Sequence, residues 1–90
     1  MADSKRSDAP RAVVVGTVVR VRPDHRGGWR VRLAETGGAL AAAEIRRSHP
    51  LPIPARGTRI LLCGPISYDP DHDWYAVDPL DAWRPVYGGA

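Results

Sequence analysis

Arginines alternate with other side chains at two places in this chain of 90 residues. Arg20 and Arg22 end a valine-rich run, and Arg30 and Arg32 lie eight residues further on. In an extended strand, residues i and i+2 point to the same side of a sheet. Guanidinium groups bind phosphate through paired hydrogen bonds and also stack on bases. The spacing therefore predicts a phosphate-binding face built by two strands.

The segment between the two pairs has the composition of a turn. Residues 23–28, Pro-Asp-His-Arg-Gly-Gly, favour turn conformations, so strands at 11–22 and 29–35 are expected to form a hairpin. Its turn would add Arg26 to the face. Like charges directly opposite each other on paired strands cost stability, and a phosphate backbone would relieve that cost. A solvated face in a protein rich in arginine explains the same pattern without a ligand.

Aromatic side chains are the second requirement, because proteins that bind single strands stack bases on them. Trp29 shares a face with Val31 and Leu33 and is predicted to join the core. Trp74 and Tyr75 are neighbours in the last predicted strand, so they point to opposite faces. We expect one of the two to be exposed and assign Tyr75 to the interface. The predicted nucleic-acid-binding residues are Arg20, Arg22, Arg26, Arg30, Arg32 and Tyr75.

Charge is divided unevenly along the chain. Residues 1–59 carry twelve basic and five acidic side chains, a net charge of +7, whereas residues 60–90 carry one and five, a net charge of −4. This division favours an anionic partner for the first part. The acidic loop at 69–73 could cover the arginine face of its own molecule or of a neighbour.

The acidic loop begins like a calcium-binding loop, with Asp69, Asp71 and Asp73 at alternate positions. Trp74 and Leu80 then stand where such a loop requires Gly and Glu, so a metal-free hairpin loop is expected. The three histidines lie in separate loops without paired spacing. We therefore expect no metal and no cofactor. No nucleophile or phosphate-loop motif is present, and enzyme activity is not expected.

The cysteine count and the lengths of the apolar runs indicate the cellular compartment to be expected. Cys63 is the only cysteine, so an intramolecular disulfide and a thiolate zinc cluster are excluded, and a buried, inert thiol is expected. The first ten residues have no apolar core of a signal peptide, and no apolar run reaches the 18 residues of a membrane span. A cytoplasmic protein without membrane contact is expected. The Arg, Ala and Gly content is typical of a bacterium with a GC-rich genome.

The elements that must position these residues are predicted to be strands. A flexible tail at 1–10 precedes strands at 11–22 and 29–35, and Gly16 is expected to bend the first of them. A turn is expected at 36–38. Residues 39–47 fit either a short helix or a strand at 39–42 followed by irregular chain.

The second half of the chain begins with an extended connector. Alternate prolines produce this connector at 48–56, before strands at 58–66 and 74–78 and a C-terminal tail at 81–90. The order predicts an all-β, five-stranded OB-fold-like Greek-key barrel at 11–80, with an SH3-like barrel as the alternative.

The final hairpin resembles that of small bacterial OB-like domains. The resemblance is carried by three segments that together suggest the family pattern G-x-x-V-x-V-x-G followed by D-x-x-H-x-W-W-E-[IV]-H-P-V. These are Gly57-Thr-Arg-Ile-Leu-Leu-Cys-Gly-Pro-Ile, Tyr68-Asp-Pro-Asp-His72 and Trp74-Tyr-Ala-Val-Asp78-Pro79-Leu80. Ala76 and Asp78 depart from the pattern, which has an acid and a His there. The resemblance covers residues 13–81 and implies an OB-like fold.

Two functions are compatible with these observations. The first is a small module that binds nucleic acid, DNA or RNA, in single-stranded form through the arginine face. The second is a non-catalytic accessory domain that contacts a protein partner or a second copy of itself. In that case the acidic loop and the tail at 83–87 would make the contact.

Overall fold

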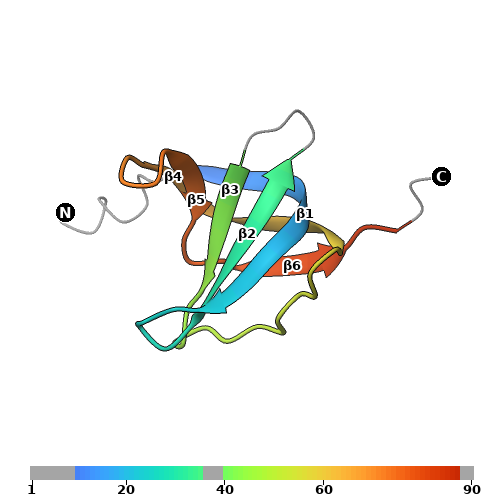
Figure 1. Ribbon diagram of the computed structural model, residues 1–90, viewed down its shortest axis with the longest axis horizontal. Coiled ribbons are helices and arrows are strands. Elements are labelled where there is room, and N and C mark those ends of the chain that lie inside the picture. Colours follow the sequence, from blue (N-terminus) through green and yellow to red (C-terminus); the bar gives the residue numbers. More distant parts are fainter. Residues whose placement is uncertain (1–9, 36–39, 88–90) are drawn as a thin grey trace.

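All regular elements of the computed structural model are β-strands (Figure 1). The structure describes residues 10–35 and 40–87, so the predicted tail before residue 10 and the predicted turn at 36–38 lie outside the described residues. The strands are β1 (Arg11–Pro23), β2 (Trp29–Glu35), β3 (Leu40–Ile45), β4 (Arg59–Asp69), β5 (Trp74–Val77) and β6 (Ala82–Pro85).

Five of the strands close into a barrel. β1, β2 and β3 pair antiparallel in sequence order, β3 pairs parallel with β5, and β5 pairs antiparallel with β4. β4 then pairs with the first half of β1, which closes the barrel, and β6 adds to the side of β4. The predicted all-β class and five-stranded barrel are confirmed, with β6 as an additional strand, and the barrel is consistent with both the OB-fold-like prediction and the SH3-like alternative.

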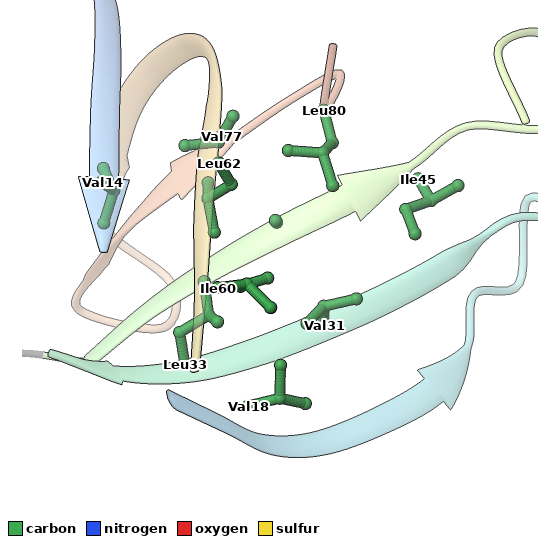
Figure 2. Close-up of a cluster of buried hydrophobic side chains, with 10 residues drawn as sticks. Val14, Val18, Val31, Leu33, Ile45, Ile60, Leu62, Val77 and Leu80 are labelled. Carbon is green, nitrogen blue, oxygen red and sulfur yellow. The ribbon is translucent and has the colours of Figure 1, made fainter. Parts of the chain in front are cut away.

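The barrel is filled by branched aliphatic side chains from every one of its strands (Figure 2). Val31 and Leu33 are fully buried, as the alternation in 29–35 predicts, and Trp29 packs against them while half-buried. Ile60 and Leu62 face them from β4. Burial of each such side chain contributes about 1.5–3 kcal/mol, so this cluster supplies most of the stability that fixes the strands.

A bulge reverses the faces of β1 halfway along its length. Val18 pairs with Leu33 and Arg20 pairs with Arg32, so β1 has one residue more than β2 at this point, Val19. If Val19 were instead paired in regular alternation, Arg20 would share the inward face of Val18. The bulge turns Arg20 outward instead. Val19 itself is 41% exposed.

Gly16, the glycine predicted to bend the first strand, is required by close packing between β1 and β2. Gly16 lies where β1 leaves its pairing with β4 and enters its pairing with β2. A Cβ at this position would lie 3.2 Å from both the Ala34 carbonyl oxygen and the Leu33 Cβ. The glycine therefore permits close contact between β1 and β2, and the irregularity in register follows after Val18.

Residues 40–45 form a strand and not the helix that their alanines also allowed. Ala42 and Ala43 are both fully buried, because β3 has a neighbouring strand on each side, β2 and β5. Small side chains fit that confined position, and tertiary packing here outweighs the helix propensity of alanine.

The C-terminal half differs from the prediction mainly in its strand lengths. β4 continues to Asp69, so the predicted loop is reduced to a turn at 70–73, which we call the acidic turn. Cys63 is half-buried, and not buried as expected. β6 lies within the predicted tail and pairs with β4.

The connector at 46–58 has no helix or strand and runs from β3 to β4 (Figure 1). It is held against the body by β6, since the Trp83 Nε1 donates a hydrogen bond to the Pro52 carbonyl at 2.7 Å. Pro54, within the connector, has a fully buried side chain. Within the described part of the chain, no helix is long and apolar enough to cross a membrane.

Candidate nucleic-acid interface

The four arginines of β1 and β2 form two cross-strand pairs. Arg20 is the register partner of Arg32, and Arg22 is the register partner of Arg30. Partners in an antiparallel pair point to the same side of the sheet, with Cβ atoms about 5 Å apart. The structure therefore brings these four predicted residues together on one outer face. We call this set the arginine ladder.

The turn at 24–28, here the first turn, is fixed tightly at one end of the ladder. Asp24 N donates to the Gly28 carbonyl at 2.8 Å, and Gly27 N donates to the Asp24 carbonyl at 2.9 Å. Gly27 has φ +92°, which favours glycine. Gly28 packs directly on β3, where a Cβ would lie only 2.0 Å from the Ile45 carbonyl oxygen. These contacts place Arg26 beside the ladder.

Carboxylates neutralise one end of the basic face. Arg30 Nε donates to Glu44 Oε2 at 2.5 Å, and Arg26 Nε donates to Asp24 Oδ2 at 3.0 Å. Arg26 Nη2 also lies 3.6 Å from Glu44 Oε1 and 3.9 Å from Asp78 Oδ2. Glu44 and Asp78 were not predicted as part of the site, because only pairing of distant segments brings them to the arginines.

The β1 side of the ladder keeps its charge. Arg20 and Arg22 are exposed, and no carboxylate whose side chain the structure describes lies within ion-pair distance of either. Arg32 is half-buried, and its guanidinium carbon lies 4.9 Å from the centre of the Trp74 ring. This distance is within the range of a cation–π contact. An anion approaching this face would meet Arg20 and Arg22 first.

Trp74, and not Tyr75, is the aromatic residue beside the arginines. Trp74 is also 5.9 Å from the guanidinium carbon of Arg30, so it lies on the face of the ladder. Tyr75 points to the opposite side of β5, where it is 57% exposed and makes an edge-to-face contact with Tyr68. The structure therefore separates Tyr75 from the five arginines. Strand alternation alone predicted that the two aromatics diverge, but not which one joins the ladder.

The acidic turn covers Trp74. The imidazole of His72 is stacked on the indole with ring centres 4.5 Å apart and planes 6° from parallel. His72 Nδ1 lies 2.8 Å from Asp69 Oδ2, and this hydrogen bond is the main cause that lowers the pKa of Asp69. The Tyr68 hydroxyl donates to Asp73 on the other side of the turn. The turn is thus tied to both faces of the β4–β5 hairpin.

A hollow of about 260 Å³ lies between the first turn and the acidic turn. Its lining residues come from both turns and from β2–β5; they are Arg26, Arg30, Glu44, Ser67, Tyr68, Asp69, Pro70, Trp74, Ala76 and Asp78. Glu44 is the one of these with a buried charge, and its side chain is only 6% exposed. Its Oε1 has no hydrogen-bond partner among the described residues.

Burial raises the pKa of Glu44 above its ordinary value of 4.5, although the hydrogen bond from Arg30 opposes the shift. The nearby charges of Asp24 and Asp78 raise it further. Glu44 in turn raises the pKa of Arg30 through the same hydrogen bond. Arg30 therefore stays charged in this cluster, and Glu44 binds a proton more readily here than a glutamate side chain does in water.

Glu44 should make the free energy of unfolding depend on pH. Above pH 4.5 and up to its higher folded pKa, Glu44 binds more protons in the folded than in the unfolded state, so its contribution to the free energy of unfolding falls as pH rises. Glu44→Gln keeps an acceptor for Arg30 and removes this fall. Urea unfolding from pH 4.5 to 8 should show the variant gaining stability relative to the native protein. A constant difference over this range would contradict the assignment.

Among the described residues, no group of three or more His, Cys, Asp or Glu side chains has the geometry to hold a metal ion.

No known family model matches the sequence, and no curated protein or solved structure is significantly similar to it. The resemblance of the final hairpin to bacterial OB-like domains therefore stays a prediction.

Proposed function

We propose that this protein binds single-stranded nucleic acid through the arginine ladder, with Arg26 at its edge. The observation that carries the proposal is the direct pairing of Arg20 with Arg32 and of Arg22 with Arg30. Like charges at such positions destabilise a sheet. A row of phosphates would offset that repulsion, because each guanidinium can bind phosphate through two hydrogen bonds.

The position of the ladder in the barrel gives independent support. OB-folds bind oligonucleotides on the face of strands two and three and in the loops that join strands one to two and four to five. The ladder includes β2, its Arg22–Arg30 pair lies next to the first turn, and Arg32 contacts Trp74 beside the acidic turn. Arg47 lines a further hollow of about 500 Å³ beside the first turn and extends the basic surface, whereas Arg46 in the same lining is paired with Asp78.

The test compares two double variants with the same change of charge. Arg20→Ala with Arg22→Ala should weaken binding of a single-stranded oligonucleotide at low salt, because two phosphate contacts are lost. The slope of log affinity against log salt should become shallower by about 1.4, at about 0.7 per phosphate. Arg56→Ala with Arg84→Ala removes two exposed arginines outside the ladder, and its slope should stay close to that of the native protein.

Fluorescence anisotropy with labelled DNA and RNA oligomers measures both affinities and slopes. Equal losses in the two double variants would contradict a located binding face and leave only general attraction to a basic protein. A stable oligomer in light scattering, without binding of any oligonucleotide at low salt, would favour the protein-interaction alternative.

A further inference from the structure

Glu44 occupies a donor of Arg30 that a phosphate oxygen would otherwise use. Its Oε2 accepts from Arg30 Nε at 2.5 Å, and the Glu44 side chain is only 6% exposed. Carboxylates and phosphates both bind guanidinium groups through charge-assisted hydrogen bonds, so the two compete for this donor. While Glu44 is ionised, Arg30 is therefore neutralised and less available to a nucleic acid than the exposed Arg20 and Arg22 of the same ladder.

Charged groups surround Glu44 from every element that packs against it. They are Arg30 of β2, Asp24 and Arg26 of the first turn, Asp69 at the end of β4, Asp78 after β5 and Arg46 after β3. Arg46 is already paired with Asp78, and His25 lies against Asp24, with Nδ1 3.0 Å from Oδ1. Burial and the charges of Asp24 and Asp78 raise the pKa of Glu44, against the hydrogen bond from Arg30.

The second carboxylate oxygen of Glu44 is placed to hold a proton. Oε1 is buried and has no hydrogen-bond partner among the described residues, since Arg26 Nη2 is 3.6 Å away. The neighbouring Asp24 has a side chain that is only 7% exposed. Although burial raises the pKa of Asp24, hydrogen bonds from Arg26 and from the Glu44 carboxyl group lower it. A proton on Oε1 thus turns an unpaired acceptor into a donor beside an acceptor.

We propose that Glu44 is a positioning residue that controls the binding of single strands through Arg30. The ionised carboxylate holds Arg30 against β3, and a proton on Glu44 releases Arg30 to a phosphate. This inference rests on the proposed function and adds control by pH to it. The nucleic acid acts in the same direction, because a phosphate bound beside Glu44 favours the neutral carboxyl group. Binding should therefore be accompanied by uptake of a proton.

The test measures binding of a labelled oligothymidine of about twelve nucleotides by fluorescence anisotropy at low salt, from pH 4.5 to 8. Thymine gains no proton in this range, so the titration belongs to the protein. Glu44→Gln keeps an uncharged acceptor for Arg30 and should bind at least about three-fold more tightly than the native protein at pH 8. Its salt slope should be steeper by about 0.7, which corresponds to one added phosphate.

The two affinities should converge as the pH falls, because Glu44 of the native protein becomes neutral. Their ratio cancels the effect of the histidines, which both proteins carry. Asp71→Asn is the matched control. It removes the same charge from an exposed carboxylate that pairs with no arginine whose side chain the structure describes. Its affinity should stay within about two-fold of the native value throughout the range.

Calorimetry at pH 6 in two buffers of different ionisation enthalpy measures proton uptake on binding. The native protein should take up more protons than Glu44→Gln. If Glu44→Gln is unstable in thermal unfolding, His25→Ala replaces it in this measurement. Uptake that persists in His25→Ala supports the role of Glu44, and uptake that disappears overturns it.

A ratio of affinities that stays constant from pH 4.5 to 8 would overturn control by Glu44 but leave the arginine ladder in place. Equal proton uptake by the native protein and Glu44→Gln would do the same. Weaker binding by Glu44→Gln at pH 8 would also overturn it, because the carboxylate would then favour the binding conformation of Arg30. Failure of both proteins to bind the oligomer at any pH would overturn the proposed function itself.

Discussion

Val18→Asp is expected to abolish the cooperative unfolding transition of this protein. Val18 is 1% exposed in the core, next to the bulge that leaves Val19 and Arg20 on the outside. A carboxylate at position 18 would lie inside the barrel among apolar side chains. Bringing a charged group into a core costs several kcal/mol per ion, and a small domain has only about 5–15 kcal/mol in total. Urea denaturation followed by circular dichroism measures the effect.

The control is Val19→Asp, which introduces the same charge one residue further on, at a side chain that is 41% exposed. This substitution should cost only about 1 kcal/mol. If the two variants lose equal stability, the bulge does not determine which of the two valines faces outward.

Gly28→Ala should give the second-largest effect. A Cβ at this position would lie 2.0 Å from the Ile45 carbonyl oxygen and 3.1 Å from its carbon. These are backbone atoms of β3, so no side-chain rotation relieves the clash. Displacing the first turn from β3 should cost at least about 2 kcal/mol of stability. Because the first turn carries Arg26, oligonucleotide affinity should fall too, beyond any loss of folded protein.

Gly57→Ala is the matched comparison. Gly57 also has a positive φ, +90°, but no atom lies within 4 Å of a Cβ placed there. Only backbone strain applies, at about 1–2 kcal/mol, and oligonucleotide binding should be unaffected. Thermal midpoints of the two variants give the comparison. An equal loss in both would mean that the contact of Gly28 with β3 contributes nothing.

Local residue patterns predicted most of the fold. Valine-rich and alternating segments identified β1, β2, β4 and β5, because β-branched side chains suit a pleated, half-buried strand. β3 could not be assigned, since the advantage of Ala42 and Ala43 arises only from the two strands beside them. The bulge was also hidden. Residues 13–15 are consecutive valines, so either inward face is possible in the first half of β1, and the sequence does not show that this half is out of phase with the alternating residues 19–22.

The candidate site was predictable only in part. Alternation was enough to place the four ladder arginines on one face, and turn chemistry was enough to place Arg26 near them. The carboxylate of Asp78 reaches Arg46 at 2.7 Å across 32 residues of sequence, and no local pattern indicates such a contact. The same holds for Trp74, whose role depends on the pairing of β5 with β3. Long-range pairing, and not residue type, decides these positions.

β6 also affects how copies of this chain meet one another. The β4 segment from Ile60 to Cys63 has β1 on one side and β6 on the other, so its backbone donors and acceptors are shielded from strand addition by a second molecule. The edge strand of the sheet on this side is therefore β6. That strand has four residues, carries Arg84 and ends in Pro85. Short edge strands with a charge and a proline are poor templates for intermolecular β-pairing, which disfavours aggregation through this edge.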